Sequence, residues 1–377
     1  MTDELHFLMA ARREKLDAMR ARGIEPFAYS FDRTSTAQHA VSLAPEDQSG
    51  EASERVSVAG RIVSMRAHGK TAFAHLADAT GRVQLYFRRD DLGDAYSLID
   101  MLDIGDVIGV SGVVFRTRSG EPTIRVAAFE VLAKSLRPLP FAKEETASDG
   151  SVVRHMGFSD PEQRFRQRYA DLAVNPEVRA TFVARAGMTR AIRSFLDARG
   201  YLEVETPVLQ PQYGGAAARP FVTQHNALDM ALYLRIADEL YLKRLIIGGM
   251  ERVYEIGHDF RNEGVDRTHN PEFTMLEFYE AYADYEVMMD VVERLIVAAA
   301  DAVRAVEPFT DAVPVFTTPF RRIEWLGAIN AGLGTDILAL DHGGLIQHAT
   351  RLGVPRAAAM SRPKLMDEIF QLLVESK

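Results

Sequence analysis

Five short apolar runs between Arg55 and Leu132 constrain the fold of this chain more than any other feature. Glycines interrupt the chain between and within these runs, and short apolar segments divided in this way are typical of β-strands joined by tight turns. The runs cover residues 56–65, 73–78, 83–87, 107–117 and 123–132. A helical segment at 95–101 falls between the third and fourth runs. The pattern therefore predicts a small β-domain with one helix inserted after its third strand.

Five strands with a helix after the third is the order of an OB barrel, a fold that commonly binds single-stranded nucleic acid. Another small β-barrel would satisfy the strand count equally well, so the strands alone leave both possibilities open. We expect this domain to span residues 55–136. Before it, residues 1–54 are expected to form a helix at 3–22, where apolar residues recur at helical spacing, and a polar loop at 32–53.

Charge and cysteine content exclude several classes of protein. The 377 residues carry a formal net charge of −9, so any nucleic-acid contact needs a local basic surface. The chain contains no cysteine, which excludes disulfides and thiolate metal sites. Its start is acidic and lacks the apolar run of a signal peptide, and no apolar stretch is long enough to span a bilayer. We therefore expect a cytoplasmic protein that does not contact a membrane.

The second half of the chain has a different organisation. Residues 137–153 contain two prolines, a charged cluster and small polar residues, which predicts a linker. From 154 to 377 helical and strand-like segments are mixed, so the overall fold class is expected to be α+β. The expected elements are helices at 176–200, 237–247 and 284–302 and strands at 202–206, 253–256 and 273–281.

Charged residues alternate along the two strands predicted within residues 251–282. Arg261 and Glu263 follow the first strand, and a guanidinium at such a position can bind a phosphate with two hydrogen bonds. On the second strand, Glu277 and Tyr279 share one face because side chains repeat every two residues. Such a surface can hold an anion and a cation together. Charge density alone, however, is equally typical of a solvated hairpin with structural ion pairs.

The longer motifs favour a functional interpretation. Phe-Arg-Asn-Glu at 260–263, with Asn-Pro-Glu-Phe at 270–273, resembles motif 2 of the class II aminoacyl-tRNA synthetases. Gly-Tyr-Leu-Glu-Val-Glu-Thr-Pro at 200–207 resembles motif 1 of the same class. Residues 214–221 and 239–245 are similar to the lysyl enzymes rather than to the aspartyl or asparaginyl enzymes. This resemblance covers nearly the whole chain from Arg55 and implies an N-terminal five-stranded OB barrel followed by the antiparallel sheet of a class II catalytic domain, flanked by helices.

The resemblance implies an enzyme that uses ATP to convert L-lysine to lysyl-adenylate and then transfers lysine to tRNA(Lys). Arg261 matches the arginine that contacts the α-phosphate of ATP and the carboxylate being activated. Glu263 and His269 match residues that face ATP, and Phe273 matches the ring that stacks on adenine. Arg261 and Glu263 are therefore the expected catalytic residues.

The resemblance also assigns a lysine pocket and an anticodon-binding surface. Residues matching the pocket are Gly215, Glu239, Arg261, Glu277 and Tyr279. Several carboxylates are chemically required there, because lysine carries two cationic groups that lose water on binding.

Residues matching the anticodon surface are Arg66, Phe73 and Gln84. A splayed base can stack on an aromatic ring while polar side chains bind its edge. A place for Phe73 in the core of the barrel is the main alternative.

Further implications of the resemblance are a homodimer formed through motif 1 and a Mg²⁺ cofactor. The glutamates that hold Mg²⁺, and motif 3 of the family, are expected beyond Lys377, so no metal ligand is assigned within this chain. Asp238 stands where relatives usually have proline, and Gly257-His258 before Asp259 is also unusual.

Because motif 3 supplies a second ATP-binding arginine and part of the catalytic sheet, we predict that the 377-residue polypeptide alone is inactive or nearly so. Lysine-dependent exchange of pyrophosphate with ATP is the measurement that checks this, and exchange clearly above background would contradict it. The alternative function is a non-catalytic tRNA-binding module derived from a synthetase. Retained tRNA binding without ATP binding would favour that alternative.

Overall fold

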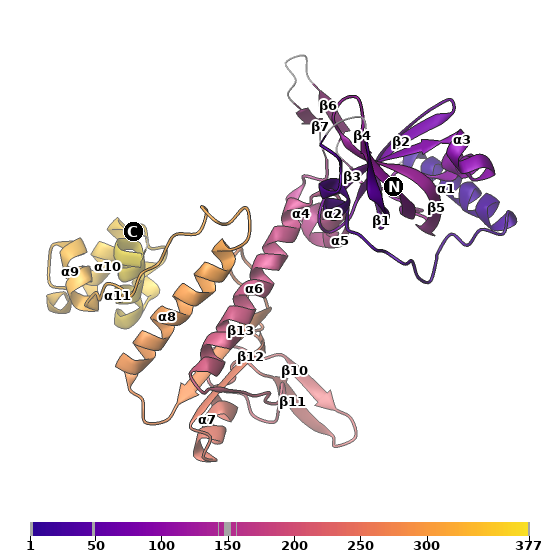
Figure 1. Ribbon diagram of the computed structural model, residues 1–377. Helices are drawn as coiled ribbons and strands as arrows, with labels where there is room; N and C mark the ends of the chain where they lie inside the picture. Colours follow the sequence, from indigo (N-terminus) through magenta and orange to yellow (C-terminus); the bar gives the residue numbers. More distant parts are fainter. Residues whose placement is uncertain (1–2, 47–49, 142, 147–151, 156, 376–377) are drawn as a thin grey trace. The chain divides into compact units, whose positions relative to one another are not determined.

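The computed structural model (Figure 1) describes residues 3–46, 50–141, 143–146, 152–155 and 157–375. The chain forms two compact units, Met1–Arg179 and Ala180–Lys377. We describe each unit by itself.

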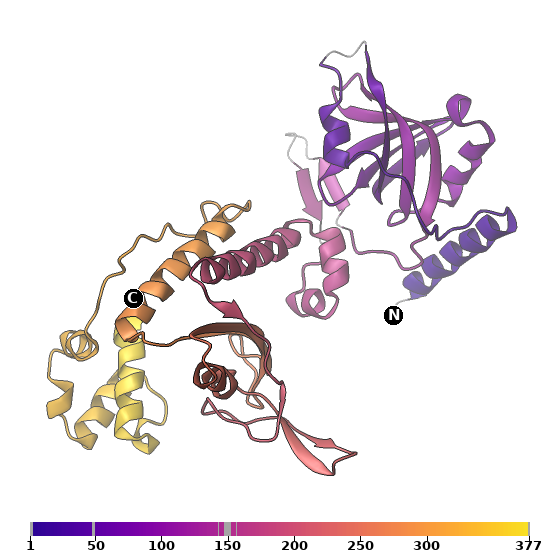
Figure 2. The same cartoon turned by 60° about the horizontal axis from the view of Figure 1, so that its bottom comes forward.

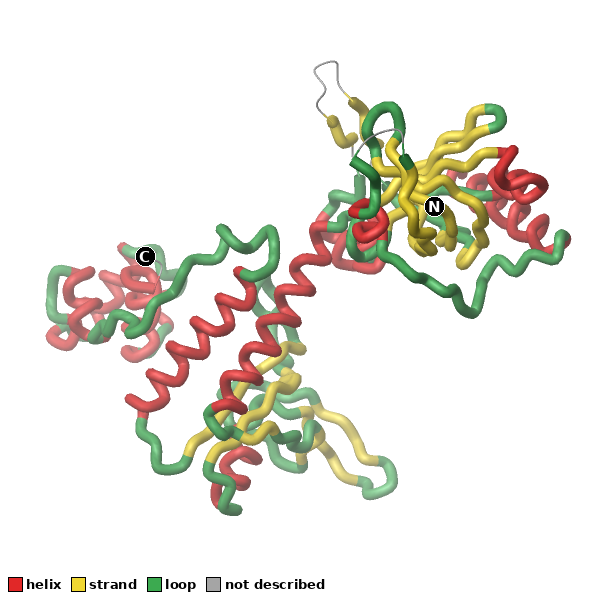
Figure 3. The backbone as a smooth tube through the Cα atoms, viewed as in Figure 1, coloured by secondary structure: helices red, strands yellow, loops and turns green. Residues whose placement is uncertain are grey.

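The first unit is built around a closed five-stranded barrel, whose strands are gathered in yellow in Figure 3. The strands are β1 (Glu51–His68), β2 (Thr71–Ala77), β3 (Arg82–Arg88), β4 (Val107–Arg116) and β5 (Pro122–Ala133), in the order β1-β2-β3-β5-β4. All neighbouring pairs are antiparallel except β3 with β5. After β3 come the short helix α3 (Arg89–Leu92) and the 3₁₀ helix η1 (Gly93–Met101). The predicted OB barrel with a helix after the third strand is thus confirmed.

Buried and partly exposed residues alternate strictly along strand β2 of the barrel. Along β2, Ala72, Ala74 and Leu76 are buried in the barrel core, whereas the residues between them remain partly exposed. This is the two-residue period expected of a strand with one face in a core. The outward residues of neighbouring strands therefore form one continuous surface on the barrel.

Elements outside the barrel differ partly from the prediction. Helix α1 (Asp3–Ala21) agrees with the helix expected at 3–22. The segment 32–53 was expected to be loop, which is wrong in part, because it contains helix α2 (Ala37–Ser42) and the start of β1. In α2, Thr36 Oγ1 accepts a hydrogen bond from the His39 amide, and the small side chains of Ala37 and Ala40 are fully buried against the barrel. Two alanines gave too weak an apolar pattern to predict this helix.

The remaining elements of the first unit are short. They are the paired strands β6 (Lys143–Thr146) and β7 (Val152–His155) and the helices α4 (Pro161–Arg166) and α5 (Arg168–Val174). The buried carboxylate of Asp171 accepts hydrogen bonds from Arg164, Arg168 and Asn175, which ties α4, α5 and the residues after them together.

The second unit contains two small sheets. In one, β12 (Arg252–Phe260) pairs antiparallel with β13 (Glu272–Glu280) and parallel with the two-residue strand β8 (Leu202–Glu203). The other consists of β9 (Leu209–Gln210), β10 (Val222–His225) and β11 (Met230–Leu234), all antiparallel. The strand expected at 202–206 is therefore shorter than predicted, and the strand expected at 253–256 is longer.

Two long helices cover one face of the first of these sheets. Figures 1 and 2 both show α6 (Glu177–Ala198) and α8 (Tyr285–Arg304) side by side. Tyr254 on β12 is completely buried with Leu196 of α6 and Leu295 of α8. Asp284 caps α8 as predicted, because its carboxylate accepts hydrogen bonds from the amides of Glu286 and Val287. The short helix α7 (Glu239–Ile247) and the residues that lead into it pack on the opposite face of the sheet.

The chain continues into a cluster of helices with its own apolar core. Its members are α9 (Trp325–Leu333), η2 (Ile337–Ala339), α10 (His342–Arg351), η3 (Ala357–Ala359), α11 (Arg362–Phe370) and the single π-helical turn η4 (Gln371–Glu375). Ile329, Leu345 and Leu365 lie at the centre of this cluster and are fully buried. Across the residues that the structure describes, no helix combines the length and the apolarity needed to cross a lipid bilayer.

Candidate functional site

The β12/β13 hairpin places three of the predicted site residues, Phe273, Glu277 and Tyr279, on one face. Its register places Glu255 opposite Glu277 and Asp259 opposite Phe273. Directly paired residues point to the same side of a sheet, so these four side chains share a face. Because Tyr254 and its even-numbered neighbours face α6 and α8, the odd-numbered face is the one available for chemistry.

A buried arginine that the sequence did not single out organises this face. Arg235 follows β11, is among the largest fully buried side chains of the described chain, and extends over Gly257. A Cβ atom on Gly257 would lie 1.8 Å from Arg235 Nη2, so only glycine leaves room for the guanidinium. Arg235 Nη1 forms ion pairs with Asp238 at 2.9 Å and Glu255 at 2.5 Å, while Nε lies 3.3 Å from Asp259.

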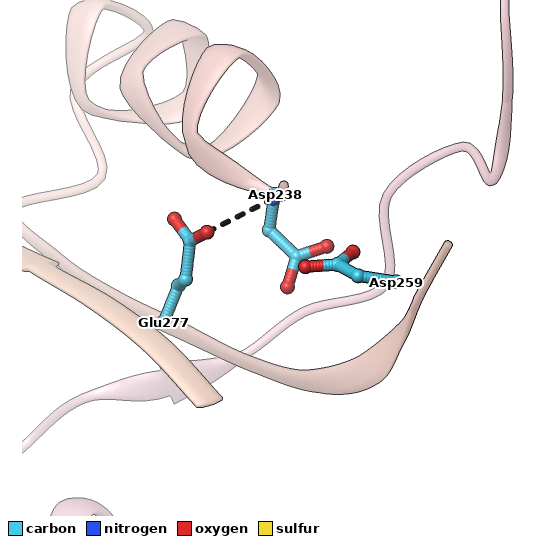
Figure 4. Close-up of side chains that lie close together, drawn as sticks. All are labelled: Asp238, Asp259 and Glu277. Atoms are coloured by element: carbon cyan, nitrogen blue, oxygen red, sulfur yellow. Dashed lines mark hydrogen bonds between the residues drawn. The ribbon is translucent and has the colours of Figure 1, made fainter. Parts of the chain in front are cut away.

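The carboxylates of Asp238, Asp259 and Glu277 lie close together, as Figure 4 shows. Each offers an oxygen within 4.8 Å of the others. Asp238 and Asp259 are fully buried, and none of their four carboxylate oxygens has a hydrogen-bond partner, although both lie close to the charge of Arg235. The only hydrogen bond among the three runs from the Asp238 amide to Glu277 Oε1, at 3.2 Å.

The protonation of this pair follows from its surroundings. Burial and the facing carboxylate of Asp259 raise the pKa of Asp238 to about 8, against the opposing effect of Arg235. Burial also raises the pKa of Asp259, to about 6. Two carboxyl groups this close cannot easily ionise together, so one proton remains between them near neutral pH.

The residues predicted to bind lysine lie next to this cluster. Gly215 adopts φ +90°, and a Cβ on it would lie 2.8 Å from the Cβ of Glu239. Glycine is therefore needed both for the backbone conformation and for the close approach of its loop to Glu239, the first residue of α7. The structure thus brings Gly215 and Glu239 together.

Glu277 and Tyr279 form a second carboxylate position close to Glu239. The Tyr279 hydroxyl donates to Glu277 Oε2 at 3.0 Å, and burial together with the Glu277 charge raises the pKa of the phenol, which keeps it a donor. Lys243 approaches the same place from α7. Its ammonium donates to Glu239 Oε1 at 2.7 Å and lies 6.0 Å from the centre of the Tyr279 ring.

Arg261 and Phe273 stand together at the end of the hairpin. The Arg261 amide donates to the carbonyl of Pro271, which fixes the backbone where β12 ends. Its guanidinium lies 5.1 Å from the centre of the Phe273 ring and 3.4 Å from the carbonyl oxygen of Ile236. The arginine and the ring are therefore adjacent and partly buried, and their roles toward ATP stay predictions.

Glu263 and His269 lie in the exposed loop between the two strands. The His269 ring contacts the Asp266 carboxylate at 2.9 Å. The amides of Thr268 and His269 also donate to Asp266, and the pKa of Asp266 is lowered to about 2, chiefly by the Thr268 amide. The structure therefore holds His269 in a turn that is closed by the Asp266 carboxylate. Roles for Glu263 and His269 toward ATP stay predictions.

The barrel carries the second predicted site on its outer surface. Phe73 points outward and is partly exposed, so it is not part of the barrel core. Its ring lies 4.8 Å from that of Tyr86, and the Arg66 guanidinium lies 5.6 Å from the Phe73 ring centre. Phe115 extends this aromatic surface at 6.1 Å from Tyr86. Tyr86 and Phe115 were missed because the outward side of β3 and β4 could not be assigned before the register was known.

Gln84 lies on the same outer surface but is only 3% exposed. Its amide nitrogen donates to Glu121 at 2.6 Å, and its carbonyl oxygen accepts from the Thr123 hydroxyl at 2.9 Å. Reading of an anticodon base by Arg66, Phe73 and Gln84 stays a prediction. For Gln84 it would require Glu121 or Thr123 to release the amide.

The close packing of Arg235 on Gly257 leads to a prediction about stability. In Gly257→Ala the guanidinium must move, which leaves Asp238 and Glu255 buried without their cation. We expect local stability to fall by about 3 kcal/mol or more. Hydrogen exchange of the β12 amides is the measurement. Gly264→Ala is the matched control, since a Cβ there meets nothing within 4 Å. Equal protection of β12 in both variants would contradict the prediction.

The raised pKa values of Asp238 and Asp259 lead to a prediction about pH. Between about pH 4 and pH 8 the folded state binds more protons than the unfolded state, so this contribution to stability is full at the acidic end and is lost as pH rises. The asparagine of Asp238→Asn cannot ionise. We therefore expect the free energy of unfolding of this variant, relative to that of the parent chain, to increase by about 1 kcal/mol or more from pH 5 to pH 8. Denaturant unfolding at both pH values checks this, and an unchanged difference would count against it.

Comparison with known proteins gives two family matches. The family described as "tRNA synthetases class II (D, K and N)" matches residues 160–353, which include β12, β13 and the carboxylate cluster. The family described as "OB-fold nucleic acid binding domain" matches residues 56–132, which are the barrel strands.

Individual relatives agree with these matches. The lysine–tRNA ligase of Carboxydothermus hydrogenoformans is 48% identical over 99% of this chain and 74% of its own length. That of Syntrophomonas wolfei is 50% identical over 98% of the chain and 73% of its own length. That of Halalkalibacterium halodurans is 46% identical over 100% of the chain and 75% of its own length. With this identity over nearly its whole length, the chain belongs to the lysine–tRNA ligase family of class II tRNA synthetases.

Proposed function

We propose that the activity to which this chain contributes is that of a lysine–tRNA ligase, which activates L-lysine with ATP to lysyl-adenylate and transfers the lysyl group to tRNA(Lys). Each relative named above is a lysine–tRNA ligase, and none supports the alternative of a non-catalytic tRNA-binding module.

One observation carries the choice of substrate. The protein already places an ammonium group, that of Lys243, against the carboxylate of Glu239 and near the ring of Tyr279. Glu277 lies beside them, with its carboxylate held by the Tyr279 hydroxyl and the Asp238 amide. A substrate with two ammonium groups matches a surface with two separate carboxylates, both of which are partly buried. Free lysine would replace the Lys243 ammonium at Glu239.

The activation step needs positioned charge rather than a protein nucleophile. A carboxylate oxygen of lysine attacks the α-phosphorus of ATP, the new C–O–P linkage forms, and the bond to the β-phosphate breaks as pyrophosphate leaves. Negative charge grows on the phosphoryl oxygens, and a guanidinium fork can accept it with two hydrogen bonds. Arg261 is the proposed donor, and its position over Phe273 supports a place for adenine on that ring.

In the transfer step, a terminal ribose hydroxyl of the tRNA attacks the carbonyl carbon of lysyl-adenylate. The ester bond forms, the hydroxyl loses its proton, and AMP leaves. The outer barrel surface with Phe73, Tyr86 and Arg66 supports the contact with the anticodon loop, because exposed aromatic rings stack on unpaired bases.

The family resemblance also implies Mg²⁺. In the part of the chain that the structure describes, only Asp238, Asp259 and Glu277 bring three carboxylates close enough to share an ion. Arg235 already places its charge 2.9 Å from Asp238, and both Glu277 oxygens accept hydrogen bonds. These residues do not fit a Mg²⁺ ion, so no step is assigned to a metal bound there.

Association into a homodimer through motif 1 is part of the proposal. Exposed apolar side chains on the elements of this motif support it, namely Phe182 and Val183 of α6 and Leu202 of β8. Apolar side chains that are exposed in one protomer can be covered at a subunit interface. We place the protein in the cytoplasm, where tRNA is charged.

Lysine recognition can be tested by comparing two ligands that differ only in the terminal amine. We expect the parent chain to bind L-lysine at least about tenfold more tightly than norleucine, because the amine pairs with a partly buried carboxylate. Glu277→Gln should bring the two affinities close together. Isothermal titration calorimetry gives both affinities.

Glu272→Gln is the matched control, since Glu272 lies on the same strand but points to its other face. That variant should keep the preference of the parent chain. A parent chain that binds lysine and norleucine equally would contradict the proposed substrate. A preference that survives in Glu277→Gln would instead remove Glu277 from the site.

A further inference from the structure

A hollow of about 380 Å³ lies in the first unit, where α5 and the first turn of α6 meet β1, β2 and β4. The strand register pairs Arg61 with Ala77 on one side and with Val107 on the other. Directly paired residues point to the same side of a sheet, so these three side chains form the floor of the hollow. Tyr169 of α5 and Arg179 of α6 line it from the helices.

Two arginines line this hollow, and each donates only to backbone carbonyl groups. Arg61 Nη1 donates to the Gly105 carbonyl oxygen at 2.6 Å. Arg179 donates from Nε to the Leu172 carbonyl and from Nη1 to the Asp78 carbonyl, both at 3.1 Å. Among the residues that the structure describes, no carboxylate forms an ion pair with either guanidinium. Both therefore keep N–H donors for a further partner.

The carboxylates near the two guanidiniums are already engaged with other groups. Asp106 forms an ion pair at 2.8 Å with the buried ammonium of Lys134. The carboxylate of Asp78 accepts hydrogen bonds from three backbone amides and lies 3.7 Å from Arg33 Nη1. Once these pairs are formed, the hollow retains the positive charges of both arginines.

The two guanidiniums act on one another through their charges. Burial lowers the pKa of Arg61, and the charge of Arg179 lowers it further, against the opposing effect of Asp106. Two like charges in a partly buried place repel one another, and an anion between them removes that repulsion. The hollow is therefore electrostatically suited to an anion with two negative charges.

An exposed aromatic ring stands at the same hollow. Tyr169 is 66% exposed, and within the described part of the chain its side chain forms no hydrogen bond and no ring contact. Such a ring is free to stack on a planar group that enters from solvent. Pockets for small molecules have volumes of roughly 300–1,000 Å³, so the hollow is large enough for more than a bare ion.

We propose that this hollow binds a nucleoside monophosphate, whose terminal phosphate lies between Arg61 and Arg179 and whose base stacks on the Tyr169 ring. Each guanidinium fork donates to phosphate oxygens, and the two positive charges match the two negative charges of a terminal phosphate. A phosphodiester of an RNA backbone carries one charge and is a poorer match. Every base has a face that can stack, so the site selects the phosphate rather than the base.

The experiment compares uridine 5′-monophosphate with its methyl phosphodiester, well above the second phosphate pKa of about 6, by isothermal titration calorimetry. We expect the parent chain to bind the monophosphate about tenfold more tightly than the diester. Arg61→Gln and Arg179→Gln should each weaken binding of the monophosphate about tenfold, because glutamine keeps an N–H for the carbonyl group but has no charge. Tyr169→Leu should weaken binding of both ligands about fivefold and leave their ratio unchanged.

Arg116→Gln is the matched control. Arg116 is also a partly buried arginine of the barrel that donates to carbonyl groups, those of Pro45 and Gly120, but it does not line the hollow. This variant should bind both ligands as the parent chain does, which would show that loss of one positive charge from the barrel is not itself the cause.

Three outcomes would overturn the inference. They are a parent chain that does not bind the monophosphate, equal affinity of the parent chain for the two ligands, and binding that survives in both Arg61→Gln and Arg179→Gln. If a glutamine variant fails to fold, Tyr169→Leu still tests the site, because the exposed Tyr169 side chain holds no other element in place. The comparison of lysine with norleucine tests the proposed ligase activity separately, so either can fail without the other.

Discussion

The arrangement of the second unit depends on the buried guanidinium of Arg235. This one side chain donates to the His258 carbonyl of β12 and to the hydroxyl and carbonyl of Thr206, and it pairs with the carboxylates of Asp238 and Glu255. It therefore connects the segment after β8, the entrance to α7 and the middle of β12. Planar geometry and several donors allow an arginine to join so many segments, whereas a lysine could not. Ile236, the next residue, offers the carbonyl oxygen that Arg261 approaches.

The electrostatics of the site follow from the surplus of carboxylates around that single cation. Asp238, Asp259 and Glu255 all lie against Arg235, and Glu277 lies beside them. Part of the surplus is removed by a retained proton, since the pKa of Asp238 is raised to about 8. Glu239 and Glu277 add two further carboxylates next to this group, against the single additional cation of Lys243. Such a surface attracts a cationic amino acid before any specific contact is made.

Sequence and structure agree best where a pattern is local. Alternating strands with glycines in the turns were enough to predict the barrel, and the motifs around Arg261 and Glu277 were enough to place both residues on one hairpin. The helix α2 was missed because it is held by buried alanines rather than by large apolar groups. Arg235 was missed because nothing near it in the sequence shows that Gly257 will provide its space. The contacts of His75 with Ser64 and Glu121 were missed because they join segments whose register only folding determines.

The packing of Arg235 over Gly257 also restricts how sequences of this kind can diverge. A side chain at 257 displaces the guanidinium, and without the guanidinium the acidic groups at 238 and 259 lose the cation nearest to them. A change at 257 or at 235 therefore affects the carboxylates at 238 and 259 as well. In related proteins, we expect a proline or another neutral residue at 238 to occur together with a neutral residue at 259. Where both are neutral, residues other than glycine can stand at 257. The four positions should be inherited as a set, so their co-variation across relatives would trace this single buried contact through the history of the family.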